Sequence, residues 1–212
     1  TVYGLAANAY SSKAILKIFK LKKRPKNNPL IVHYSSLEML KRDCILNRNF
    51  TNLYNKFCPG PLTFILKLRN DSKISKFVTN KKKTLAVRFP SHPIAKGLLK
   101  ILNYPLAAPS ANISSRVSPV TKNHVKEEFG KKIKYIIEGG RSKIGLESTI
   151  INLTGKPEIL RIGSIDINKL SKALKKNLIY RKKTYMEVPG QNRLHYSCLL
   201  YTSDAADDVV GG

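Results

Sequence analysis

The predicted fold is centred on one stretch, Lys22-Lys-Arg-Pro-Lys-Asn-Asn-Pro-Leu-Ile-Val-His33. It begins as the basic end of a helix, bends at Pro25 and Pro29, and continues as an apolar run that predicts a strand. Both prolines fix φ and favour extended geometry in the residues before them. Lys22 and Arg24 are two residues apart, so on an extended backbone we expect them to project to the same side. Two such cations suit the phosphates of a nucleotide, although a solvated basic loop is the alternative.

The length and composition are those of a folded α/β protein with an unusual charge. The chain has 212 residues, of which 42% are hydrophobic, enough for one sizeable domain. Its formal net charge of +26 invites a nucleic-acid interpretation. The lysines are nevertheless scattered beside asparagine and isoleucine, which fits a general compositional bias equally well. In either case we expect at least weak, salt-sensitive binding of polyanions.

The cysteines and the hydropathy pattern limit the cellular setting. Cys44, Cys58 and Cys198 have no C-x-x-C spacing and no paired histidines, so neither a metal site nor a disulfide framework is expected. This usage fits a reducing cytoplasm. There is no apolar run near 20 residues and no signal-peptide pattern, so no membrane partner is expected.

The two ends of the sequence differ from the rest. Thr1 lies inside what looks like a structured loop. Residues 198–212 contain three of the 13 acidic residues and no lysine. We therefore expect this tail to be non-native or disordered.

Patterns of apolar residues predict one twisted, mixed, open α/β sheet with flanking helices. Predicted strands are 30–33, 62–68, 84–89, 106–108, 133–137, 148–153 and 158–162. Predicted helices follow Ser11 or Ser12 and the capping box Ser35-x-x-Glu38, and others occupy 52–57, 91–101 (capped by Ser91), 121–129 and 165–174.

Polar side chains recur where these strands begin or end, the place where ligands bind in open α/β sheets. They are Lys22, Arg24 and Asn28 before one strand and His33 at its end, Thr84 and Arg88 on one face of another, Ser110 and Asn112, Glu147-Ser148-Thr149, and Arg161. Each alone is more typical of an ordinary cap, turn or ion pair. The sequence has no G-x-x-x-x-G-K-[ST], G-x-S-x-G or G-x-G-x-x-G motif, so a nucleotide would bind without those loops.

Taken together, seven motifs resemble a known family. In order they are Thr-Val-Tyr-Gly-Leu, Lys-x-Arg-Pro-x-x-Asn-Pro-Leu-Ile-Val-His, Cys-Pro-Gly-Pro-Leu-Thr, Ala-Val-Arg-Phe-Pro-x-His-Pro, Ala-Pro-Ser-Ala-Asn-x-Ser, Glu-Ser-Thr-Ile and Leu-Arg-Ile-Gly. Over about residues 1–175 they resemble the threonylcarbamoyl-AMP synthase family, the YrdC-type domain. The resemblance implies a concave twisted sheet with a positively charged cavity, and it predicts this domain over 1–180 with a shortened N-terminus.

The resemblance also implies a reaction. L-Threonine, bicarbonate and ATP, with Mg²⁺ on the triphosphate, would give L-threonylcarbamoyl-AMP and pyrophosphate. A separate tRNA threonylcarbamoyltransferase machinery would use that product to make threonylcarbamoyladenosine in tRNA. Such a transfer needs positioning and neutralised charge more than a protein nucleophile, so the lack of a Ser-His-Asp set is no objection.

The resemblance assigns site residues position by position, and none of them is a metal ligand. Catalytic roles fall on Lys22, Arg24, Ser110 and Asn112. The ATP side comprises Arg24, Asn28, Thr84, Asn112, Val120, Arg161 and Tyr196. The L-threonine side comprises Thr1, His33, Arg88, Ser110 and Ser148, and Arg88 can hold the substrate carboxylate through two hydrogen bonds.

A later motif suggests how longer members continue. Val188-Pro-Gly-Gln-x-x-x-His195-Tyr196 resembles the linker to a smaller C-terminal domain in those members. Residues 181–197 are therefore predicted to be that linker, with the second domain missing and Tyr196 as a candidate nucleotide contact.

Two other functions remain open at this stage. The first is a non-catalytic module that binds double-stranded RNA or tRNA, which the charge would allow. The second is a carbamoyl-transfer domain of a hydrogenase-maturation protein, which ranks last because the zinc-finger cysteines that accompany that domain are absent from the sequence.

Overall fold

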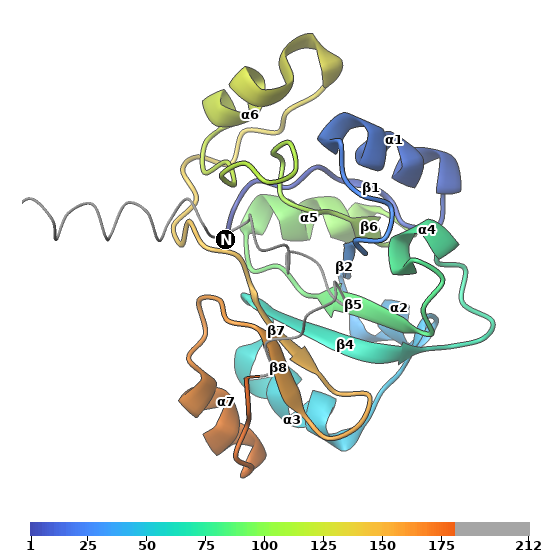
Figure 1. Cartoon of the computed structure of the whole chain (residues 1–212), viewed down its shortest axis with the longest axis vertical. Helices are drawn as coiled ribbons and strands as arrows, with labels where there is room; N and C mark the ends of the chain where they lie inside the picture. The colour runs from blue at the N-terminus through green and yellow to red at the C-terminus, as the bar shows by residue number, and fades with distance from the viewer. Residues whose placement is uncertain (181–212) are drawn as a thin grey trace, which may run out of the picture.

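The computed structural model describes residues 1–180, which form one open mixed sheet with helices around it (Figure 1). The strands are β1 (Ala7–Asn8), β2 (Ile31–His33), β3 (Cys44–Ile45), β4 (Leu62–Leu68), β5 (Thr84–Arg88), β6 (Leu106–Ala107), β7 (Thr149–Asn152) and β8 (Glu158–Arg161). Their order in the sheet is β1-β6-β2-β5-β4-β7-β8, and β3 pairs with β4. The pairs β2–β5 and β4–β7 are parallel and the others antiparallel, so the predicted mixed sheet is confirmed.

The helices account for most of the predicted helical segments. They are α1 (Ser12–Lys22), α2 (Leu37–Lys41), α3 (Arg48–Phe57), α4 (Lys76–Thr79), α5 (Pro93–Ile101), α6 (Lys122–Phe129) and α7 (Ile167–Leu174), with a 3-10 turn at Gly130–Lys132. In the described part of the chain, no helix combines the length and apolar character needed to cross a membrane.

The two faces of the sheet are used differently because side chains alternate along each strand. Leu62, Phe64 and Leu66 of β4 point into the main core, which also takes apolar side chains from α1, α3 and α7. Ile65 lies on the opposite face of β4 and belongs to a small apolar cluster. That cluster consists of Ile31, Ile65, Ala86, Ile150 and Leu160, each from a different strand.

A bulge between β7 and β8 changes which face the end of β8 presents. Ile151 is paired with Ile159, but the next pair is Ile150 with Arg161, so Leu160 is an extra residue on β8. A bulge re-aims the side chains that follow it. Strict alternation from Ile159, a core residue, would turn Arg161 into the core. The bulge instead places Arg161 opposite Ile150, on the face away from the main core.

Several local predictions were wrong. Residues 133–137 are not a strand: Ile133 and Ile136 pack against the cluster formed by α6 and Ala111, while Tyr135 is exposed. The short strands β1 and β3 were missed because two residues give no alternation to detect.

Two helix caps also differ from prediction by one residue. The N-cap of α2 is Ser36, whose hydroxyl accepts the Met39 amide, rather than Ser35. The N-cap of α5 is His92, which makes no side-chain capping bond, rather than Ser91. Pro93 follows it as the first helical residue, a position that suits its fixed φ.

The stretch that was expected to hold Lys22 and Arg24 on one extended side does not do so. Lys22 is the last residue of α1, and Lys23 adopts the left-handed conformation at φ 48° and ψ 37°. The two cations are therefore separated by a helix end and contact different loops.

Substitution of Gly163 by alanine tests how tightly the turn after β8 packs against the start of β7. A Cβ at this position would lie 2.4 Å from the Thr149 amide nitrogen and 2.5 Å from the Glu147 carbonyl oxygen. Both are backbone atoms, so we expect Gly163→Ala to lower the free energy of unfolding by roughly 2 kcal/mol or more. Gly155→Ala is the matched control, because a Cβ there meets no atom within 4 Å. Denaturant unfolding of both variants checks this, and equal stabilities would contradict the described packing.

Candidate active site

Five paired residues, four of them polar, form one row across five neighbouring strands, on the face away from the main core. His33 of β2 is paired with Arg88 of β5, and Arg88 with Thr63 of β4. Thr63 is in turn paired with Ile150 of β7, and Ile150 with Arg161 of β8. Residues paired across strands project from the same face, so the sheet register alone places two arginines in one row.

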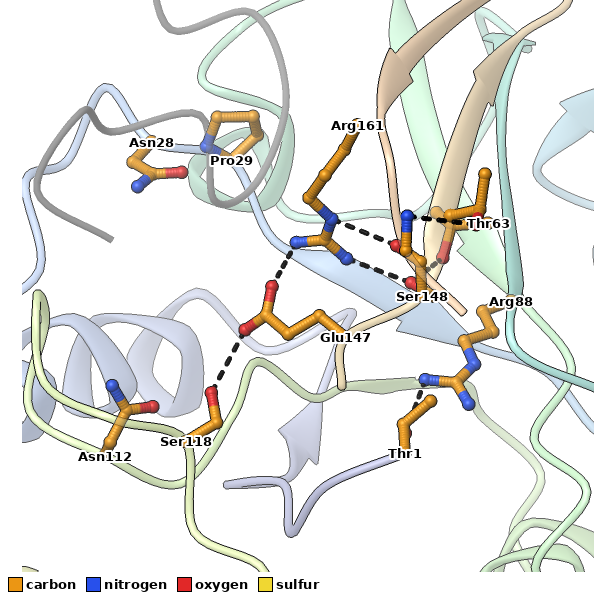
Figure 2. A network of polar contacts seen from close by, with 12 residues as sticks. Thr1, Asn28, Pro29, Thr63, Arg88, Asn112, Ser118, Glu147, Ser148 and Arg161 are labelled. Carbon is orange, nitrogen blue, oxygen red and sulfur yellow. Dashed lines mark hydrogen bonds and ion pairs between the residues drawn. The ribbon is translucent and has the colours of Figure 1, made fainter. Parts of the chain in front are cut away.

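The end of the row at β8 is a network around Arg161 (Figure 2). Its Nε donates to the Ser148 carbonyl oxygen at 3.0 Å and its Nη2 to the Ser148 hydroxyl at 3.0 Å. Nη1 donates to Glu147, forming a buried ion pair. The Ser148 hydroxyl lies 2.7 Å from that of Thr63, and Ser118 donates to the other carboxylate oxygen of Glu147 at 3.2 Å.

Arg88 of β5 lies next to His33 near the other end of the row and is 8% exposed. Its Nε donates to the Gly60 carbonyl oxygen at 3.1 Å, and its Nη1 donates to the Thr1 hydroxyl at 2.9 Å (Figure 2). Two residues on the predicted L-threonine side, Thr1 and Arg88, are therefore in contact.

Lys22 supports the loop that carries the S-x-N signature. Its Nζ donates to the carbonyl oxygens of Ser110 and Asn112, both at 2.5 Å, and lies 3.4 Å from the Asn112 side-chain oxygen. The Asn112 amide group donates to the carbonyl oxygens of Ile113 and Arg116 at 2.8 and 2.7 Å. In this structure Lys22 thus acts on the protein's own loop, and Asn112 braces that loop from within.

Arg24 organises the proline-containing loop in the same way. Its Nε donates to the Asn28 carbonyl oxygen at 3.0 Å, and its Nη2 donates to the Asn28 side-chain oxygen at 2.5 Å and to the Pro29 carbonyl oxygen at 2.8 Å. Asn28 is buried, so the contact of these two predicted ATP-side residues is an internal one.

Burial and mutual repulsion destabilise the protonated forms of these side chains and so lower their pKa values. Burial, with Arg24 adding to it, lowers the pKa of Lys22 to about 7. Burial lowers the pKa of Arg24 and of Arg88 to about 10, with Arg161 adding to each shift, so both arginines stay charged at neutral pH. Burial and the neighbouring Arg88 hold the pKa of His33 well below its usual value, which keeps the ring neutral.

The remaining predicted residues lie apart from this network or outside the described chain. Thr84 lies at the opposite end of β5 from Arg88 and lines a small hollow with Pro29 and Lys82. Val120 accepts the Ser142 amide at 2.8 Å through its carbonyl oxygen, joining two loops. Tyr196 lies outside the described residues.

Three residues of the network were not among the predicted site residues. Thr63 contacts Ser148, Ser118 contacts Glu147, and Glu147 in turn contacts Arg161. Thr63 could have been predicted as a site residue because it places a hydroxyl inside the apolar strand Leu62–Leu68. Glu147 could have been predicted from its place in the polar run before β7. Nothing in the sequence pairs Ser118 with a residue 29 positions away.

Buried cations that converge at one end of an open mixed sheet define an α/β protein with a candidate site for anionic small molecules. Whether these residues line a basic cavity stays a prediction. The profile of the Sua5/YciO/YrdC family, described as "Telomere recombination", matches residues 1–163. The chain belongs to this family.

Two curated relatives of this chain carry the same name. The chain is 37% identical over 248 residues to threonylcarbamoyl-AMP synthase of Schizosaccharomyces pombe, covering 100% of this chain and 61% of that protein. It is 39% identical over 207 residues to that of Pyrococcus abyssi, covering 93% of this chain and 59% of that protein. The chain thus spans about three-fifths of the length of these curated relatives.

A solved structure shares the fold. The crystal structure of P. abyssi Sua5 complexed with L-threonine superimposes with a TM-score of 0.85 at 39% identity. The match covers 91% of this chain and 58% of that one. The YrdC-like fold predicted from the sequence is therefore confirmed.

The buried amine of Lys22 gives the protein a testable pH dependence. Its pKa is lowered from 10.5 to about 7 in the folded state, so between these values the unfolded chain binds the additional proton. Stability due to Lys22 should therefore rise with pH over this window, by at most about 1.4 kcal/mol per pH unit. Urea unfolding of wild type and Lys22→Met at several pH values measures the difference, in which other titrating groups cancel. A difference that does not change with pH would contradict the lowered pKa.

Proposed function

We propose that this protein synthesises L-threonylcarbamoyl-AMP from L-threonine, bicarbonate and ATP, with release of pyrophosphate. The observation that carries the proposal is the row of paired residues on the sheet, which contains Arg88 next to His33 at one end and Arg161 at the other. Two arginines in one row, separated by Thr63 and Ile150, suit two anions that must lie beside each other. The relatives' name and the L-threonine complex of P. abyssi Sua5 support the identity of those anions.

L-Threonine is assigned to the Arg88 end. The guanidinium group can hold the substrate carboxylate bidentately, with Thr1 and Ser148 supplying hydroxyl groups near it and a neutral His33 paired with Arg88 on the next strand. Ser110 and the neighbouring loop complete this side of the proposed site.

ATP is assigned to the side of Arg24, Asn28, Asn112 and Arg161. We also propose that ATP contacts Thr84, Val120 and Tyr196, and this part of the proposal rests on the family resemblance. The polar groups in this part of the structure are cations, amides and hydroxyls, together with the carboxylates of Glu147 and Glu128. Such a set suits Mg²⁺ that arrives already held by the triphosphate oxygens, because Mg²⁺ prefers oxygen ligands and keeps its waters.

The chemistry then needs alignment and charge neutralisation. The amine of L-threonine adds to carbon dioxide derived from bicarbonate and loses a proton, forming an N–C bond and a carbamate. A carbamate oxygen attacks the α-phosphorus, the bond to the β-phosphate oxygen breaks, and pyrophosphate leaves. The product is a mixed anhydride for a tRNA threonylcarbamoyltransferase system, and we place the reaction in the cytoplasm.

Replacement of Arg88 tests the L-threonine assignment. Arg88→Ala should raise the KM for L-threonine by about a hundredfold, because a charge-assisted bidentate contact is lost, while the KM for ATP changes much less. Arg69→Ala is the control, since Arg69 is an exposed arginine paired with Asp71. The measurement is pyrophosphate release with and without L-threonine and bicarbonate. Release that does not depend on either substrate would reject the enzyme.

The RNA-binding alternative is favoured only by the net charge of +26. If the protein were a passive module, tRNA would bind tightly and Arg88→Ala and Ser148→Ala would leave that binding unchanged. Filter binding of tRNA to wild type and both variants, beside the pyrophosphate assay, separates the two functions. Tight binding without turnover would favour the module.

A further inference from the structure

The site places several positive charges where little solvent can compensate them. Lys22, Arg88 and Arg161 are 1%, 8% and 4% exposed, and Arg24 is half-buried. Arg24 and Lys22 repel each other, as do Arg161 and Arg88. A group of buried cations of this kind needs a counter-charge in the free protein.

Glu147 is a carboxylate in direct contact with one of these cations, Arg161 (Figure 2), and Glu128 is a second carboxylate whose charge acts on Lys22. Glu147 forms the ion pair with Arg161, in which the two side chains are 15% and 5% exposed, and it accepts the Ser118 hydroxyl at 3.2 Å. Arg161 is bound on its other edge to the carbonyl and hydroxyl oxygens of Ser148. The guanidinium plane is thus fixed from two sides.

The negative charge of Glu147 acts beyond its contact with Arg161. It raises the pKa of Lys22, of Arg24 and of Arg88, against the lowering caused by burial. The charge of Glu147 therefore acts on cations from α1, the proline-containing loop and β5, and Glu128 adds to its effect on Lys22.

We propose that Glu147 is a positioning residue that holds Arg161 against Ser148 and takes the electrostatic place of the anionic substrates in the free protein. This inference rests on the proposed function, which supplies the anions. ATP and L-threonine together bring more negative charge than Glu147 supplies. A phosphate oxygen that approaches Arg161 must therefore meet the repulsion of Glu147, so the carboxylate weakens anion binding while it orders the arginine.

Charge and position can be separated with two substitutions. Glu147→Gln keeps the length of the side chain but removes its charge. Glu147→Asp keeps the charge but withdraws the carboxylate by one methylene from Arg161 and Ser118. Glu127→Gln is the matched control, because Glu127 is an exposed residue of α6 and the change in net charge is the same.

The first measurement is calorimetric titration of each purified protein with inorganic pyrophosphate at low salt. Glu147→Gln should bind pyrophosphate roughly three- to tenfold more tightly than wild type and Glu127→Gln. Glu147→Asp should bind it as wild type does. General structural damage would weaken binding, so the expected change has the opposite sign to that of a merely structural role.

The second measurement is kcat and KM for pyrophosphate release. Glu147→Asp should lower kcat about tenfold or more, since Arg161 is no longer aligned. Glu147→Gln should lower the KM for ATP and leave the KM for L-threonine nearly unchanged. If Glu147→Gln does not fold, Ser118→Ala loosens the same carboxylate at unchanged charge, and the proposal then requires a lower kcat with unchanged pyrophosphate affinity.

The outcomes decide separately between this inference and the proposed function. Pyrophosphate affinity of Glu147→Gln no higher than that of Glu127→Gln overturns the electrostatic role, and a wild-type kcat in Glu147→Asp overturns the positioning role. Wild-type protein that releases no pyrophosphate in response to L-threonine rejects the proposed function. In that case the pyrophosphate titrations still measure how the charge of Glu147 affects anion binding, because they need no turnover.

Discussion

The structure depends on cations that are buried before any substrate is present, and each of them is satisfied by main-chain oxygen atoms. Lys22 donates hydrogen bonds to the carbonyl oxygens of Ser110 and Asn112, and Arg161 donates one to the carbonyl oxygen of Ser148. Arg88 donates a hydrogen bond to the carbonyl oxygen of Gly60. An unpaired buried cation would be strongly unfavourable, so each loop that offers a carbonyl is held at a defined place. The same bonds that stabilise the loops therefore assemble the site.

This arrangement changes how the K-x-R and S-x-N signatures are understood. The sequence suggested that their cations and amide point toward a ligand. In the structure Lys22 and Asn112 hold one loop, while Arg24 and Asn28 hold another. Under the proposed function, these residues would influence a substrate partly through the loop geometry they enforce. Substitutions at these positions would change substrate binding and stability together, unlike substitutions at a side chain that contacts substrate alone.

Much of the fold could be predicted because the long strands have a clear pattern. β4 is apolar and buried on both faces over most of its length, and β5 contains an uninterrupted apolar run, as expected for central strands. Residues 133–137 are equally apolar, yet they cover α6, because local pattern does not say which surface an apolar run will meet. The positive φ of Lys23 was also invisible, since lysine seldom adopts it. Residues in contact within the site were predictable as a set from family motifs, but their pairing depends on loops brought together over long sequence separations.

The position of Arg161 shows how a small departure from regular structure sets the geometry of the whole site. Ser148 and Arg161 can meet only if β8 presents Arg161 on the face of Ile150. A regular β8 without the bulge would pair Leu160 with Ile150 and turn the Arg161 guanidinium group toward the apolar core, where it would have no oxygen partner. The next turn of the chain is fixed by Thr149, whose hydroxyl accepts the amides of Gly163 and Ile165. Three successive residues, Glu147, Ser148 and Thr149, thus bind the carboxyl-terminal end of β8 from both sides. The bulge is maintained by these contacts, and through it the row of arginines that the proposed chemistry requires.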